Sequence, residues 1–99
     1  MKYNENQILE IAKKVLQDLN GEYYNEKDLV KIIFKKNDMV ARPSGAILDT
    51  WTVSIDALFN NRDFLTISDE TGEPLYYQNF NTTIAEIEKN SDGKYVTKN

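Results

Sequence analysis

The chain has 99 residues, contains neither cysteine nor histidine, and carries a formal net charge of −4 from 16 acidic and 12 basic side chains. A chain of this length forms one domain with a single modest core. The missing residue types exclude disulfides, thiolate sites, and the most common general base and metal ligand. The acidic balance argues against nucleic acid as a partner, because binding phosphates requires basic side chains.

An amphipathic helix is predicted near the N-terminus, beginning after Asn4. Gln7 follows Asn4 by three residues, which makes an Asn-x-x-Gln version of the capping box. Gly21 is expected to end the helix, since glycine readily adopts the left-handed conformation after a last turn. One stripe at helical spacing is apolar and is expected to pack on the core: Ile8, Ala12, Val15, Leu16 and Leu19.

The segment 27–36 fits either a helix or a strand. Its β-branched and aromatic residues favour the strand. The residues 37–49 are then expected to form a long irregular connection. Within it, Pro43 biases the residue before it to an extended conformation, and Gly45 permits a turn.

The clearest pattern in the chain is an alternation of apolar and polar residues over 51–57 and 64–77, interrupted at Gly72. Such alternation is typical of antiparallel strands with one face in the core and the other in water. The predicted core face consists of Trp51, Val53, Ile55, Leu65, Ile67, Leu75 and Tyr77. The predicted solvent face consists of Thr50, Thr52, Ser54, Asp56, Thr66, Ser68, Tyr76 and Gln78.

The two turns between these strands determine their register. An odd-length loop or a bulge near 60–62 keeps the apolar residues on one face, and it would pair Ile55 with Ile67. A second loop of about three residues, ending at Gly72, would pair Ile67 with Leu75. Gly72 would then adopt the left-handed conformation of a bulged turn.

The segment 83–96 also fits two structures. It would form a short helix if Thr83 is the cap and Glu86 completes a capping box. It would form a hairpin if the chain turns at 90–93, and the apolar residues after that turn, beginning with Tyr95, favour this alternative. The predicted fold is therefore α+β, with an N-terminal amphipathic helix packed on a curved antiparallel sheet of four to six strands, as in a cystatin-like half-barrel.

No motif for catalysis or for a cofactor is present in the sequence. It contains no phosphate loop, dinucleotide-binding fingerprint, zinc spacing or nucleophile elbow. Asp49 and Asp56 flank the strand that contains Trp51, but alternation places Asp56 in water, where a carboxylate is ordinary. The acids near Gly72 match no calcium loop. We therefore expect a protein that is not an enzyme and uses no cofactor or metal.

An acidic and aromatic patch is the first candidate for a partner-binding surface, formed by Asp56, Asp69, Glu70, Glu73 and Tyr76. Three of these acids gather at one turn, beside a tyrosine expected on the solvent face. Exposed aromatic residues anchor interfaces, and carboxylates steer basic partners. The next candidate contact residues are Met39, Arg42 and Ile47.

Four features follow one another along the chain: the helix at 8–19, the extended segment at 29–34, the Trp-containing strand at 51–55, and the strand 65–72 that ends in Asp-Glu-Thr-Gly. In this order they resemble the small α+β immunity proteins that neutralise toxins in bacterial polymorphic toxin and contact-dependent inhibition systems. The pattern is similar to the family called immunity protein thirty-five. The resemblance implies a binding protein without catalytic residues, and the net charge of this chain suits a basic, nuclease-type toxin as its partner.

A second reading gives the protein a different function. The chain would then be a cystatin-like or nuclear-transport-factor-like module that holds a small ligand beneath its helix. No apolar run reaches the roughly 20 residues of a membrane helix, and the first residues lack the pattern of a signal peptide. Both readings therefore place the protein in the cytoplasm without a membrane partner, and a homodimer stays open.

Overall fold

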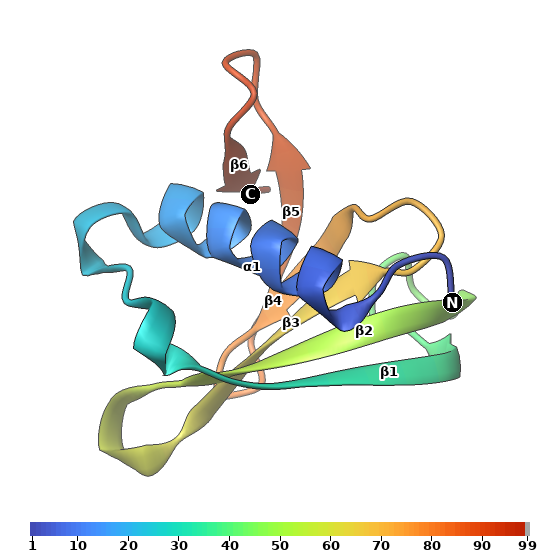
Figure 1. Ribbon diagram of the computed structural model, residues 1–99, viewed down its shortest axis with the longest axis horizontal. Coiled ribbons are helices and arrows are strands. Elements are labelled where there is room, and N and C mark those ends of the chain that lie inside the picture. Colours follow the sequence, from blue (N-terminus) through green and yellow to red (C-terminus); the bar gives the residue numbers. More distant parts are fainter. Residues whose placement is uncertain (99) are drawn as a thin grey trace.

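The structure, a computed structural model, describes residues 1–98 and shows within them one long helix packed on an antiparallel sheet of six strands (Figure 1). The predicted α+β fold is confirmed. The helix α1 spans Glu5–Asn20. The strands are β1 (Leu29–Met39), β2 (Ile47–Asp56), β3 (Arg62–Ser68), β4 (Pro74–Gln78), β5 (Ile84–Lys89) and β6 (Tyr95–Thr97), and they lie side by side in chain order. The 3-10 turns η1 (Gly21–Tyr23) and η2 (Glu26–Asp28) lie between α1 and β1, and η3 (Leu58–Asn60) lies between β2 and β3.

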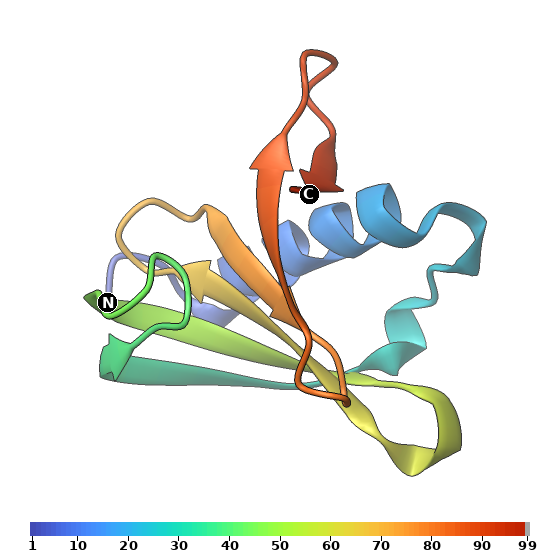
Figure 2. The ribbon, with the colours of Figure 1, turned by 180° about the vertical axis from the view of Figure 1, so that it is seen from behind.

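The sheet is open and strongly twisted, as expected for right-handed strands. β5 stands nearly upright in the view in which β1 lies horizontal, and the turned view shows the same relation from behind (Figures 1 and 2). The helix crosses one face of the sheet, and the β5–β6 hairpin rises beside its last turns. Among the described residues, no helix is long and apolar enough to cross a membrane.

The helix begins and ends where the sequence predicts. The Asn4 side chain accepts a hydrogen bond from the backbone N–H of Gln7 (2.8 Å), and the Gln7 side chain accepts one from the N–H of Asn4 (2.9 Å). Gly21 follows the last turn with a φ of +57°. The predicted apolar stripe packs on the sheet, within a core made of Ile8, Ala12, Val15, Leu16, Trp51, Val53, Ile55, Leu65, Ile67, Ile87 and Tyr95.

The β2–β3 loop has the predicted odd length, but the predicted pairing is wrong. The loop has five residues, 57–61, and it closes at the pair Asp56–Arg62. Ile55 therefore lies opposite Asp63 rather than Ile67, a shift of four positions (67 − 63). Because side chains alternate with a period of two, an even shift keeps every apolar residue on the core face.

The β3–β4 turn is also longer than predicted. Gly72 has the expected positive φ of +73°, but the N–H of Ser68 bonds the carbonyl of Glu73 and closes a four-residue loop. A bulge after Thr66 then places Ile67 opposite Pro74, so the predicted pair with Leu75 is wrong. Leu75 is only partly buried and lies outside the core cluster.

Segment 27–36 contains the predicted strand, and 83–96 forms the hairpin rather than the helix. The expectation of a long irregular connection over 37–49 is wrong. β1 continues to Met39 and β2 already starts at Ile47, so only 40–46 form the loop. A bulge accommodates the extension, with Asn37 at a φ of +54°.

Most of the predicted solvent face is buried. Six of its side chains are buried: Thr50, Thr52, Ser54, Thr66, Ser68 and Tyr76. The loop 40–46 folds over this face, where the N–H of Ala41 donates a hydrogen bond to the Tyr76 hydroxyl (3.4 Å). Thr52, Ser54 and Thr66 line a hollow of about 340 Å³ on this face, together with longer side chains such as Lys35 and Phe64.

Candidate binding surface

Asp69, the first acid of the predicted patch, is a structural residue. Its side chain is buried, with 3% of its surface exposed. The carboxylate accepts hydrogen bonds from the indole Nε1 of Trp51 (2.8 Å) and from the backbone N–H groups of Lys2 (2.8 Å) and Tyr3 (3.1 Å). Burial alone would raise the pKa of Asp69, but these donors and the N-terminal amine outweigh it, so the pKa is lowered. Asp69 therefore ties the N-terminal segment to the sheet.

The Asp69 carboxylate also determines the position of Trp51. Its indole shares Asp69 with Tyr3, so the ring lies beneath the start of α1. Its edge-to-face contact with Phe34, at 5.2 Å between ring centroids, fixes it further. Leu19 lies at the other end of the helix, beside the hollow that Tyr77 lines.

Two other members of the predicted patch lie apart from the turn. Tyr76 is buried, with its hydroxyl under the 40–46 loop, so the expectation that it reaches solvent is wrong. Asp56 is exposed, but it lies at the opposite end of β2 and pairs with Arg62 (2.9 Å). Only Glu70 and Glu73 remain together and exposed on the turn.

Two of the next candidate contact residues, Met39 and Ile47, are exposed in the structure. Met39 and Ile47 are direct cross-strand partners in the last pair of the β1–β2 hairpin, and they are 70% and 60% exposed. Met1, 80% exposed, shares with Ile47 a hollow of about 330 Å³ that Asp69 and Glu70 also line. The hairpin end thus brings three large apolar side chains beside a carboxylate.

We call this region the hairpin-end surface, defined by Met1, Met39, Ile47, Glu70 and Glu73. Arg42, the third residue of the second predicted group, does not belong to it. Its guanidinium pairs with Glu86 (3.4 Å) from the 40–46 loop, on the side of β5. Its charge is therefore partly engaged within the protein.

A hollow of about 390 Å³ opens at the last turn of α1, but its polar groups serve the fold. The Tyr77 hydroxyl donates to Asp63 (2.6 Å), which also accepts from the N–H of Phe80 (3.0 Å). Burial, together with the Asp63 carboxylate, raises the pKa of Tyr77. Asp18 accepts from the N–H of Tyr95 (3.0 Å) and thereby holds β6 to the helix.

The centre of the interface between helix and sheet is filled. Ile8, Ala12 and Val15 on the helix have no exposed surface, and neither do Val53, Leu65 and Ile67 below them. Two hollows in the described part of the chain open to the surface at the ends of this interface, one lined by Leu19 and Tyr77 and the other by Gln7 and Trp51. Residues 1–98 contain no group of three acidic side chains placed to hold a metal ion.

Sequence reasoning missed the three structural carboxylates, Asp18, Asp63 and Asp69. Each joins segments far apart in the chain, with separations of 77, 17 and 67 positions for the N–H groups of Tyr95, Phe80 and Lys2. No local motif marks such contacts. Comparison with known proteins adds no relative, since no family model, curated protein or solved structure matches this chain.

Proposed function

We propose that the protein is a binding protein of the immunity type, which neutralises a toxin domain by covering it with the hairpin-end surface. The exposed pair Met39–Ile47 carries this proposal. Large apolar side chains grouped in water are costly for a monomer, and such groups mark sites that a partner covers. The four-feature resemblance to small α+β immunity proteins supports the same function.

The chemistry around the pair indicates what kind of partner fits. Methionine adapts its shape to an irregular surface and would fill an apolar recess on the partner. Glu70 and Glu73 lie on the adjoining turn, where they remain exposed to the solvent. Carboxylates at the rim of an apolar contact favour a partner with lysine or arginine around its own contact area, as on a nuclease that binds phosphates.

The filled core favours this function over the small-ligand module. A ligand held beneath the helix needs a cavity between helix and sheet of several hundred Å³. The side chains at the centre of that interface, such as Ile8 and Leu65, are instead completely buried, and the hollows of about 390 and 750 Å³ lie open at its two ends. We accordingly propose a binding role without catalytic turnover.

A co-expression experiment tests the proposal. The protein is produced together with the toxin domain encoded beside its own gene, and growth rescue and co-elution are measured. The double variant Met39→Ser/Ile47→Thr removes apolar surface from two exposed positions and leaves the core intact. We expect it to bind at least about tenfold more weakly, equivalent to about 1.4 kcal/mol, and to rescue growth poorly.

Phe59 provides a matched control. Its side chain is 89% exposed in the β2–β3 loop, at the end of β2 opposite to Ile47. Its φ is +58°, and asparagine tolerates such a conformation, so Phe59→Asn is a suitable substitution. This variant should bind like the wild type. Full rescue by the Met39/Ile47 variant would contradict the proposed surface, and the absence of any rescue by the wild type would contradict the proposed function.

A further inference from the structure

Among residues 1–98, β1 is an edge strand with no strand paired on its outer side. It is the first strand in the order of the sheet, and both views show it as the outermost strand on its side (Figures 1 and 2). Between two bulges, residues 31–35 pair regularly with β2. Such a strand spans about 17 Å and presents the outward N–H and C=O groups of every second residue for pairing with another chain.

A groove runs beside this regular stretch on the helix face. It measures about 750 Å³ and lies between the N-terminal segment and β1. Its apolar lining includes Tyr3, Ile32, Phe34 and Trp51, and its polar lining includes Lys2, Glu5 and Gln7. A side chain from a neighbouring strand would enter this groove, because alternate residues of a strand point to the same face.

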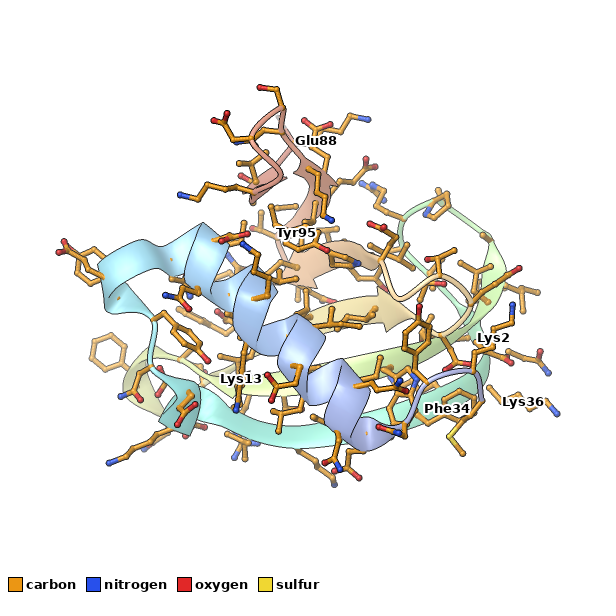
Figure 3. The ribbon with its side chains drawn as sticks, turned by 45° about the horizontal axis from the view of Figure 1, so that its top comes forward. Lys2, Lys13, Phe34, Lys36, Glu88 and Tyr95 are labelled. Carbon is orange, nitrogen blue, oxygen red and sulfur yellow. The ribbon has the colours of Figure 1, made fainter. Side chains whose placement is uncertain are left out.

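The charge of this edge opposes that of the whole protein. Lys31, Lys35 and Lys36 are exposed on β1, and Lys2 lines the groove. Figure 3 shows Lys2 and Lys36 at the same end of the molecule as Phe34. Within residues 1–98, none of these four lysines forms an ion pair. A chain of net charge −4 thus carries a basic strip along its open strand edge.

We infer that β1 is a docking edge for an extended acidic segment of another protein, which pairs with residues 31–35 as an additional strand. The faces of β1 determine the pattern that this segment needs. Ile32 and Phe34 point to the groove, so Lys31 and Lys35 point to the opposite face. The segment therefore alternates carboxylates, which face the lysines, with an apolar side chain that enters the groove.

The lysines also decide against a second copy of this chain. Two β1 strands paired with each other would place lysine beside lysine along a short stretch, and like charges on neighbouring strands destabilise pairing. Lysines on an open edge are a common protection against self-association. Here an apolar groove lies beside the lysines. The edge therefore disfavours pairing with a second β1 strand and favours pairing with a strand that carries carboxylates. The inference does not depend on the hairpin-end surface.

The test uses a library of random 12-residue peptides displayed on phage and selected on the full chain. We expect the selected peptides to be acidic, with carboxylates at alternating positions around an apolar residue. Their binding should weaken at least tenfold in Lys31→Glu/Lys35→Glu. The variant Lys89→Glu/Lys94→Glu makes the same charge change on the exposed β5–β6 hairpin and should bind normally.

Amide hydrogen exchange locates the bound peptide. The bound peptide should slow exchange at alternate residues of 31–35 and leave exchange at Met39 and Ile47 unchanged. An empty selection, peptides without carboxylates, or equal binding by both double variants would overturn the inference. A dimer in sedimentation that Lys31→Glu/Lys35→Glu disrupts would also overturn it, because the edge would then belong to a second copy.

Discussion

Replacing Asp69 should loosen the N-terminal segment and expose the underside of the helix start. Asp69→Ala leaves the indole N–H of Trp51 without its acceptor, in a side chain that is 5% exposed. An unsatisfied buried donor costs about 1–3 kcal/mol. The N–H groups of Lys2 and Tyr3 can return to water if the segment detaches, which adds about 1 kcal/mol of lost contacts. We therefore expect a total loss of about 2–4 kcal/mol, a large part of the stability of a domain this size.

The loss should depend on pH in a defined direction. The pKa of Asp69 is lowered in the folded protein, so the carboxylate stabilises the fold at every pH above its ordinary value near 3.8. As the pH falls from there through the lowered pKa, the folded state must also bind the proton, and the contribution disappears. The difference between wild type and Asp69→Ala should thus be constant above about pH 5 and shrink below about pH 4.

Urea unfolding measures this difference. Trp51 is the single tryptophan, so its fluorescence reports the local change, and circular dichroism reports the global one. Glu70→Ala is the control, since it removes an exposed neighbouring carboxylate and should change stability by less than about 0.5 kcal/mol. Equal unfolding free energies for Asp69→Ala and Glu70→Ala at pH 7 would refute the structural role of Asp69.

Three further changes test the packing. Gly72→Ala should lower the free energy of unfolding by about 1–3 kcal/mol, since the φ is +73° and a new Cβ would lie 2.6 Å from the Tyr3 hydroxyl. Gly93→Ala, with open space around the new Cβ, should lower it less in thermal unfolding, and the reverse order would contradict the contact with Tyr3. Trp51→Ala should cost about 3–5 kcal/mol, and near-normal stability would invert the assignment of the core face. Asp18→Asn should speed amide exchange in β6 while leaving β2 protected, and uniform exchange would argue against a local tie.

The sequence predicted the faces of the sheet better than its register. The alternation around Val53 and Leu65 is a local property, and it survives any even shift between strands. Register depends on loop length. The β2–β3 loop is closed by two residues with positive φ, Phe59 and Asn60, and the apolar pattern of the sequence does not reveal where such residues occur. Asparagine tolerates that conformation, so Asn60 carries part of the signal.

The same limit explains the missed extent of β1 and β2. Asn37 and Asp38 are poor strand formers, and they read as the start of a loop. In the structure a bulge at Asn37 absorbs the irregularity, and the N–H of Asn37 bonds the side chain of Asp49 (2.8 Å). Asp38 in turn accepts from the Thr50 hydroxyl (2.8 Å). Cross-strand partners thus compensate weak strand propensity, and such partners are known only once the pairing is known.

The candidate surface shows why counting charges is a weak guide to binding. Asp69 and Glu70 are neighbours of identical charge. The Asp69 carboxylate is buried and accepts three hydrogen bonds from the protein, whereas Glu70 is exposed to water. Asp69 is buried and lies near the positive N-terminal amine, which offsets part of its field, so it attracts a distant basic partner less than Glu70 does. An exposed apolar side chain forms no hydrogen bond or ion pair within the protein that would reduce its availability to a partner. Met39 and Ile47 therefore carry more information about an interface than the acids beside them, although the pattern of the sequence alone placed both in a loop.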